Sequence, residues 1–394
     1  MDENKEEIQE KEYKHVRKPD EPEVRKKKKK RRRRKKRMSV FKMIVLDLLV
    51  IGFGLVVFAL FHHVLDYWGI QLGEKAAEPV VIATLPPEPT PEPTPSEVPQ
   101  EAEVTPEPAA EATPEPTPEP TPTRVYSGVW GEKFADQFTD GEIIQTEDSY
   151  KSANVSVTIT RYDEPGLVYY VADIYISDLK YLGSAFANGE GNGNYNSSLA
   201  WIDAISQRVD AVVAICGDHY YGRREGMVIR NGVLYRDTHN QDVCVIYTDG
   251  RMETIMDSDL DIEEVIAAAP WQVWGFGPGL LDADGHAKTF YDGQPNALSV
   301  NPKNPRCAIG YYEPGHYCFM KVEGNRQHYF IGSYGMTLSE MAVKFEELGC
   351  KCAYNLDGGK SAAMSWLGKV YGTNYDRTIS DIIYITDAPV ESEG

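Results

Sequence analysis

Short apolar runs rich in β-branched and aromatic residues recur from residue 154 onwards and are typical of strands. They lie at residues 154–160, 169–177, 211–216, 243–247, 307–312, 317–322 and 381–386. A further apolar run ends at Asn355. These runs are unevenly spaced and are bounded by Gly, Pro, Asn and Asp, which favour turns. The pattern predicts a strand-rich domain over residues 125–394.

Two segments repeat their apolar residues at helical spacing instead. Residues 197–209 form one such segment, and residues 337–349 form the other. In the second segment, Thr337 and Glu340 make a capping box and Gly349 marks the end of the helix. Because strands greatly outnumber helices, the predicted fold class is α+β: one mixed, strand-rich domain with few helices, rather than a doubly wound sheet.

The N-terminal part has a different pattern, a block of Lys and Arg followed by an unbroken apolar run. Residues 25–37 are all basic, and residues 43–60 carry a single charge, Asp47. An apolar run of this length is near that needed to cross a bilayer, and basic residues favour the cytoplasmic side. The sequence therefore predicts a cytoplasmic tail at 1–39 and one transmembrane helix within 40–65.

The basic block alone also suggests nucleic-acid binding. Beside an apolar span, it is explained more simply by membrane orientation and by attraction to anionic lipid. We therefore predict contact with the cytoplasmic membrane through one helix, no nucleic-acid partner, and an extracellular C-terminal domain.

A segment rich in Pro, Glu and Thr follows the apolar run. Residues 86–123 hold 14 of the 25 prolines of the chain. Proline lacks a backbone N–H and the Glu residues repel one another, so this stretch cannot build a core. We predict a disordered linker over 66–124 that extends as a spacer between the membrane and the folded domain, for example across a cell wall.

The cysteines and histidines of the predicted domain give little evidence of a metal site. Six cysteines occur, at 216, 244, 307, 318, 350 and 352. An even number outside the membrane favours disulfides, but the count is too low for a disulfide scaffold, and the spacing leaves the pairing open. The histidines have no spacing typical of metal ligands, so no metal and no cofactor are predicted.

The stretch NLDGGKS at residues 355–361 carries the most chemistry. Its end resembles a nucleotide-binding P-loop, but Tyr354 stands where the first glycine of that motif belongs. The pattern instead predicts a strand that delivers Asn355 and Asp357 to a sheet edge, followed by a glycine turn whose N–H groups face an anion. A plain Asp-Gly turn between strands is the alternative.

Several motifs in the same order resemble the phosphodiester glycosidase family. That family includes the uncovering enzyme, an N-acetylglucosamine-1-phosphodiester α-N-acetylglucosaminidase, and bacterial relatives labelled exopolysaccharide biosynthesis proteins. Its NLDGGGS motif is similar to residues 355–361, with Lys360 in place of the third glycine. Its INGD turn is similar to residues 215–218, with Cys216 in place of Asn. Its PRTAIG and GLTL motifs are similar to residues 305–310 and 335–338.

The resemblance implies cleavage of a sugar-1-phosphodiester by a hydrolase. Asp357 and Asp218 match positions for a base or nucleophile and its partner, and Arg306 suits neutralisation of phosphate through its planar fork. The resemblance further implies a group of residues that contact substrate or phosphate: Asn355, Gly358, Gly359, Lys360, Ser361, Gly217 and Thr337.

The predicted function is that of a membrane-anchored extracellular phosphodiester glycosidase. Its expected partner is a glycan or sugar-phosphate of the cell wall or of an exopolysaccharide. The alternative is a non-catalytic domain on the same fold that binds cell-wall glycans, and it is motivated by Cys216 and Lys360.

Overall fold

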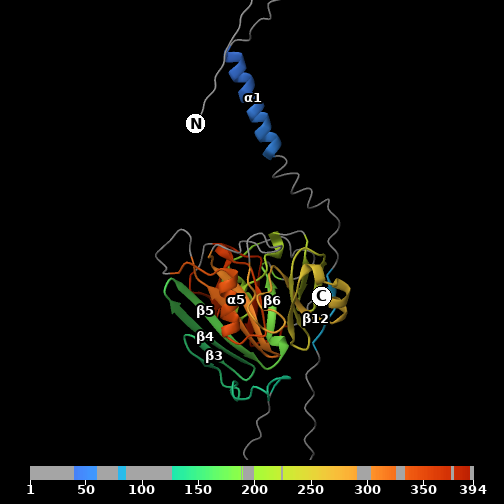
Figure 1. Ribbon diagram of the computed structural model, residues 1–394, viewed down its shortest axis with the longest axis vertical. Coiled ribbons are helices and arrows are strands. Elements are labelled where there is room, and N and C mark those ends of the chain that lie inside the picture. The colour runs from blue at the N-terminus through green and yellow to red at the C-terminus, as the bar shows by residue number, and fades with distance from the viewer. Residues whose placement is uncertain are drawn as a thin grey trace, which may run out of the picture. The chain divides into compact units, whose positions relative to one another are not determined.

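The computed structural model describes most of residues 127–390 and two shorter segments nearer the N-terminus (Figure 1). The described residues are 40–59, 79–85, 127–187, 189, 199–222, 225–290, 303–324, 333–373 and 377–390. They divide into two units, residues 1–75 and 76–394. The basic block at 25–37 and the Pro-rich stretch at 86–123 lie outside the described residues.

In the first unit the structure describes one helix, α1 (Val40–Ala59). Within the described part of the chain, no helix is both long and apolar enough to qualify as a membrane span.

The second unit is built from three sheets, and every strand pairing within them is antiparallel. The largest sheet has seven strands, in the order β15 (Cys352–Asn355), β13 (Arg306–Glu313), β14 (His316–Val322), β5 (Leu167–Ile176), β4 (Val155–Glu164), β3 (Ser149–Lys151) and β2 (Ile144–Gln145). A five-stranded sheet has the order β17 (Lys369–Tyr371), β16 (Met364–Trp366), β7 (Ala211–Cys216), β18 (Asp381–Thr386) and β6 (Leu182–Phe186).

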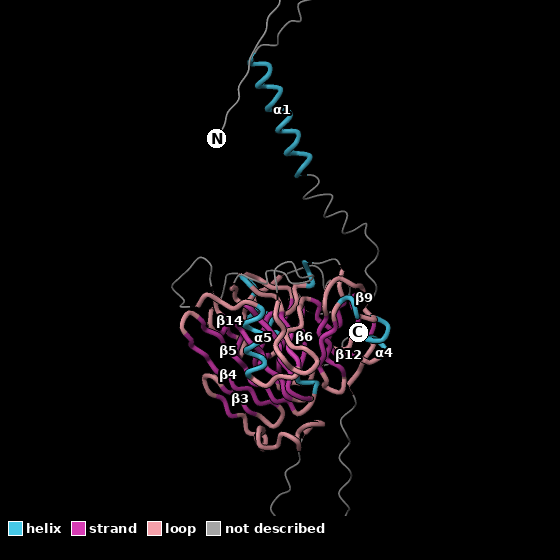
Figure 2. The backbone as a smooth tube through the Cα atoms, viewed as in Figure 1, coloured by secondary structure: helices cyan, strands magenta, loops and turns pink. Residues whose placement is uncertain are grey.

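The third sheet has six strands. Their order is β1 (Val80–Val81), β9 (Val233–Asp237), β8 (Met227–Arg230), β12 (Pro270–Gly275), β10 (Val243–Tyr247) and β11 (Met252–Ile255). In Figure 2, strands and loops make up most of this unit, and helices make up a small part of it. The predicted α+β class is consistent with this strand-rich architecture and its few helices.

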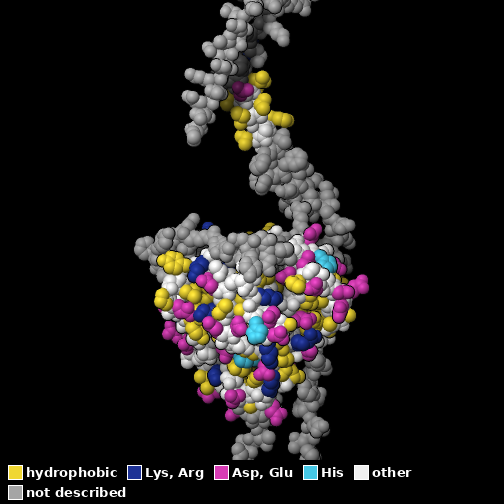
Figure 3. Space-filling model, in the orientation of Figure 1, with side chains coloured by type: hydrophobic (Ala, Val, Ile, Leu, Met, Phe, Trp, Pro, Cys, Tyr) yellow, Lys and Arg dark blue, Asp and Glu magenta, His cyan; other side chains and the backbone are white. Residues whose placement is uncertain are grey.

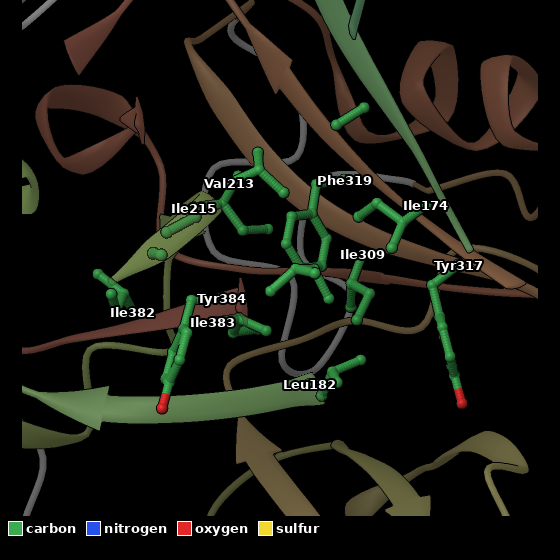
Figure 4. Packing of buried hydrophobic residues seen from close by; sticks show 14 of the residues in the cluster. Ile174, Leu182, Val213, Ile215, Ile309, Tyr317, Phe319, Ile382, Ile383 and Tyr384 are labelled. Carbon is green, nitrogen blue, oxygen red and sulfur yellow. The ribbon is translucent and has the colours of Figure 1, made fainter. Parts of the chain in front are cut away.

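The largest core joins side chains from different sheets. Figure 4 shows Phe319 and Ile309 of the seven-stranded sheet close to Val213 and Ile383 of the five-stranded sheet. All four side chains are fully buried. This packing removes one face of β13 and β14 from water.

The other face of β13 and β14 is covered by helix α5 (Leu338–Glu347). Leu338, Met341 and Phe345 of this helix pack with Ala308 and Met320, which alternate along their strands with the residues of the first core. Strands that are buried on both faces read as continuous apolar runs, which explains the sequence pattern at 307–312 and 317–322.

Helix α5 has the capping box that the sequence predicts. The side-chain oxygen of Thr337 accepts a hydrogen bond from the Glu340 N–H, and the Glu340 carboxylate accepts one from the Thr337 N–H. The helix predicted at 197–209 is shorter, since α3 covers Ile202–Arg208. The sequence analysis missed α4 (Ile262–Ala267), a short helix capped by Asp261.

Residues 79–85 form an edge of the six-stranded sheet, although the sequence predicts a linker over 66–124. The N–H groups of Ile82 and Ala83 donate to the carbonyl of Gly232, at 2.8 and 3.1 Å. Ala83 is 5% exposed, and Leu85 packs against the largest core. This short stretch, VVIATL, is apolar enough to add a strand, which its Pro-rich surroundings obscured.

Candidate active site

Asp357 follows β15 and lies where the ends of two strands from different sheets meet. Its N–H donates to the carbonyl of Gly217, just after β7, at 3.0 Å. Its own carbonyl accepts a hydrogen bond from the Cys216 thiol at 3.0 Å. The backbone of Asp357 is thus fixed on both sides, while its side chain remains 15% exposed. This combination suits a carboxylate that must meet a ligand from a defined position.

His219 is the nearest titratable partner of Asp357. Its Nδ1 lies 3.6 Å from Oδ2 of Asp357, and its side chain is 29% exposed. The backbone of His219 has φ of 59°, in the left-handed region that few residues other than glycine adopt. A Cβ at Gly222 would lie 2.1 Å from the His219 Nε2, so glycine is needed there to leave room for the ring.

His219 was not predicted as a site residue, because the histidines lack the spacing that is typical of metal ligands. The available signal was its position, directly after the Gly217–Asp218 turn that resembles a family motif. Only the fold shows that this turn meets the end of β15.

Asp218, predicted to be catalytic, lies in a buried ion network instead. Its Oδ1 is 2.9 Å from Nη2 of Arg230, which is also 3.0 Å from Oδ2 of Asp381. Its Oδ2 accepts a hydrogen bond from the Gly275 N–H at 2.7 Å. All three charged side chains are at most 2% exposed. Asp218 therefore supports the turn that carries His219 and faces no open space in this structure.

This network holds two carboxylates around one guanidinium. Burial, together with the charge of Asp218, raises the pKa of Asp381 to about 7. Gly217 makes the close approach possible, because a Cβ there would lie 2.2 Å from Oδ2 of Asp381. Gly217 thus has a packing role, and its N–H donates to the Asp381 carbonyl at 3.0 Å.

The glycine turn after Asp357 does not present the row of N–H groups that the sequence suggested. The Gly358 N–H donates to Oδ1 of Asp357 at 2.8 Å, and the Gly359 N–H donates to the Pro305 carbonyl at 2.8 Å. The Ser361 N–H donates to the Gly358 carbonyl within a 3₁₀ turn (η6, Gly359–Ser361). The expectation of an anion nest is therefore wrong for these three amides, because the turn satisfies them itself.

Two side chains beside Asp357 have buried polar atoms without a protein partner. They are Oδ1 of Asn355 and Oγ of Ser361, on either side of Asp357 in the chain. The other end of the Asn355 amide is fixed, since Nδ2 donates to the Gly277 carbonyl at 2.7 Å. Buried polar atoms rarely remain without a hydrogen bond, so these two atoms point to a bound water or ligand group.

The remaining predicted residues surround the same turn at different depths. Arg306 is buried, its Nε donates to the Met336 carbonyl at 2.7 Å, and its Cα would lie 3.5 Å from a Cβ at Gly358. Lys360 is exposed at the tip of the turn. Thr337 uses its hydroxyl in the capping box of α5. The fold thus brings Arg306 next to the turn, whereas the geometry gives Thr337 a helix-capping role.

Among the described residues, no group of three or more His, Cys, Asp or Glu side chains is arranged to hold a metal ion.

Comparison with known proteins finds a family that matches part of the chain. Residues 209–386 match the family model described as phosphodiester glycosidase. Over these residues, fewer than half of the chain, the protein is similar to a phosphodiester glycosidase domain. The match includes β7, β15 and β18, and with them His219, Asp357 and Asp381, and it confirms the resemblance found in the sequence motifs.

Individual relatives of the phosphodiester glycosidase domain are distant. The SPbeta prophage-derived uncharacterized protein YomE of Bacillus subtilis (strain 168) is 29% identical over 185 residues, which are 45% of this chain and 27% of that protein. The chain thus spans about a quarter of this relative's length.

Solved structures also resemble the phosphodiester glycosidase domain. The zebrafish N-acetylglucosamine-1-phosphodiester alpha-N-acetylglucosaminidase catalytic domain, auto-inhibited by its pro-peptide, is 20% identical with a TM-score of 0.49. That match covers 63% of this chain and 88% of the other. A hypothetical protein from Synechocystis is 14% identical with a TM-score of 0.40, over 59% of this chain and 62% of the other.

Proposed function

We propose that this domain hydrolyses the bond between the anomeric carbon of a sugar and a phosphodiester. The observation that carries the proposal is the pair of Asp357 and His219, which is partly exposed and is flanked by the unpartnered polar atoms of Asn355 and Ser361. The family match gives the class of reaction, and this pair supplies the groups that such a reaction requires.

The chemistry needs little help at the leaving group. Cleavage of the bond between C1 and oxygen releases a phosphate monoester, whose second pKa is about 6, so the departing oxygen is stable without a proton from an acid. The carbon becomes oxocarbenium-like and needs a nucleophile. In our proposal, the Asp357 carboxylate takes a proton from water while the water oxygen bonds to C1, and the bonding electrons leave with the phosphate.

His219 has two roles in this scheme. It holds Oδ2 of Asp357 toward the substrate from 3.6 Å, and in its protonated form it adds positive charge beside the departing phosphate. Asn355 and Ser361 offer buried acceptor and hydroxyl atoms for sugar hydroxyl groups. Arg306, beside Gly358, and the exposed Lys360 contribute positive charge for the phosphate.

Cys216 favours catalysis over the alternative of a domain that only binds glycans. Its thiol donates to the carbonyl of Asp357, so this departure from the family motif supports the position of the reacting carboxylate. Lys360, the second departure from the family motif, is exposed at the rim of the turn.

We further propose that the domain lies outside the cell, attached to the membrane by the apolar run at 43–60, and acts on cell-wall or exopolysaccharide glycans. The basic block at 25–37 supports this orientation through the positive-inside rule. Acidic side chains, numerous in the composition, are spread over the visible face of the domain (Figure 3).

A substrate panel tests the proposed activity. The full chain, purified in detergent, is incubated with sugar-1-phosphodiesters that differ in sugar and aglycone, and with matched alkyl glycosides that lack phosphate. We expect release of free sugar and phosphate monoester from at least one phosphodiester and none from the alkyl glycosides. Binding of a phosphodiester without product would favour the glycan-binding alternative, and cleavage of the alkyl glycosides would contradict the proposed chemistry.

A further inference from the structure

Two buried cysteines lie in contact on the face of the seven-stranded sheet that α5 covers. The Sγ atoms of Cys318, in β14, and Cys350, just before β15, are 3.7 Å apart. Both residues are at most 3% exposed and belong to the core that packs around α5. A disulfide has a sulfur–sulfur bond of about 2.0 Å, so side-chain rotation must bring the two atoms closer by less than about 2 Å.

The sheet has a glycine beside this pair of sulfur atoms. Gly310 is the direct neighbour of Cys318 across the β13–β14 ladder. A Cβ at Gly310 would lie 2.7 Å from the Sγ of Cys318, 2.7 Å from Cε1 of Phe345 and 2.9 Å from the Sγ of Cys350. Any larger residue would occupy the space that the two sulfur atoms share.

The sulfur atoms of Cys216 and Cys307 are used differently. The Cys216 thiol donates to the Asp357 carbonyl at 3.0 Å, and the Cys307 thiol donates to the Ala363 carbonyl at 3.5 Å. A disulfide has no S–H to donate, so oxidation would remove both hydrogen bonds. Cys216 and Cys307 also contact each other, but a disulfide between them would cost both of these hydrogen bonds to backbone carbonyls. Cys318 and Cys350 bond instead to each other and to the side chain of Tyr312.

We propose that Cys318 and Cys350 form a structural disulfide that ties β14 to the connection between α5 and β15. The proposal is independent of the glycosidase activity. It requires an oxidant of the disulfide class, such as a thiol–disulfide oxidoreductase or oxidised glutathione. One cysteine thiolate attacks that disulfide, the second displaces the mixed intermediate, and the oxidant leaves as two thiols with the two electrons.

The cross-link would stabilise the strand that leads into the candidate site. Cys350 lies two residues before the start of β15, which ends at Asn355, two residues before Asp357. A covalent bond from this point to the centre of the sheet limits how far the end of β15 can move when the domain opens locally.

Peptide mapping of the full chain tests the bond. One sample is purified from membranes without reductant, and a second is refolded in a buffer of reduced and oxidised glutathione. Both are unfolded in N-ethylmaleimide and digested. We expect a peptide pair linked through Cys318 and Cys350 that separates on reduction, with Cys216 and Cys307 fully alkylated. Full alkylation of Cys318 and Cys350 in both samples, or linkage of either to another cysteine, would overturn the proposal.

Thermal unfolding separates the cross-link from the packing of the side chains. Reductant should lower the melting temperature of the cross-linked chain by about 5–10 °C, from the entropy of a loop of this length. The Cys352→Ser variant keeps the pair and should keep this response. The double variant Cys318→Ala, Cys350→Ala should lose it. If the double variant does not fold, the test rests on the fall in melting temperature that reductant causes in the wild-type chain and in Cys352→Ser. The absence of that fall in both proteins would overturn the stabilising role.

Discussion

At the scale of single residues, Asp218 and Asp357 show how environment separates two carboxylates of similar sequence context. Asp218 is fully enclosed, with Arg230 and the Gly275 N–H as partners. Asp357 keeps one oxygen near His219 and a partly exposed side chain. A base must reach the proton it removes, so exposure and geometry favour Asp357 as the reacting group.

We expect Asp357→Asn to fold like wild type and to lose at least about a hundredfold in turnover, because an amide cannot act as a base. The geometry of the turn should survive, since an Asn oxygen can accept the Gly358 N–H as the carboxylate does. Steady-state kinetics on the phosphodiester found in the panel, with melting temperature as the folding control, make the measurement. Near-normal turnover would remove Asp357 from the mechanism.

The buried network predicts a dependence of stability on pH. The pKa of Asp381 is raised from 3.8 to about 7 in the folded protein. Between pH 3.8 and about 7, the folded state therefore keeps a proton that the unfolded state has released. Stability from this group is fully present below pH 3.8 and is lost as the pH rises to about 7. We expect the Asp381→Asn variant to show a smaller fall in melting temperature between pH 5 and 7 than wild type does.

The control for this prediction is the exposed Asp163→Asn variant, whose side chain is 66% exposed in a surface pair with Arg161. Its pH profile should match that of wild type. A wild-type melting temperature that rises steadily from pH 5 to 7, unchanged in slope by Asp381→Asn, would contradict the assigned proton.

At the scale of elements, the site depends on strand ends from two sheets. β7 of the five-stranded sheet ends at Cys216, and β15 of the seven-stranded sheet ends at Asn355. The hydrogen bond from Asp357 to Gly217 joins them. Each strand is buried on its core face, so the packing of the two sheets fixes the distance between His219 and Asp357.

The edge strand β1 gives a separate prediction about stability. Ala83 is 5% exposed and its N–H bonds to the six-stranded sheet, so Ala83→Glu would place a charge at a buried position. Residues 79–85 would then detach from the sheet. The loss in free energy of unfolding is therefore limited to what their docking contributes, about 1–3 kcal/mol. We expect a melting temperature lower by several degrees. Val80→Glu is the matched control, because Val80 is 53% exposed and should tolerate the change. Equal melting temperatures for both variants would show that the edge strand contributes no stability.

At the scale of the whole molecule, the predicted topology remains to be tested. If the N-terminus is cytoplasmic, protease added to intact cells should cut the Pro-rich segment and release a folded fragment that begins within residues 86–124. Mass spectrometry of the released fragment gives its first residue. Protection of the C-terminal domain until the cells are lysed would contradict the orientation.

The local sequence determined most of the strands in the core and the capping of α5. The runs at 211–216, 243–247 and 381–386 coincide with β7, β10 and β18, because residues buried on both faces leave an apolar signal that needs no tertiary information. Strands such as β8 and β17 were missed, since they are short and include charged residues. The motif at 355–361 likewise pointed to Asp357, and the order of several motifs along the chain gave the resemblance to the family.

Only the tertiary structure decided the roles of the residues around that motif. Asp218 and His219 are adjacent in the sequence, yet one joins a buried ion network and the other faces Asp357. Their environments depend on Arg230, Asp381 and Asp357, which come from other strands, so no local pattern distinguishes them. The same holds for Cys318 and Cys350. Burial, hydrogen bonding and contact are set by which strand ends the packed sheets bring together, and that information arises only when the chain has folded.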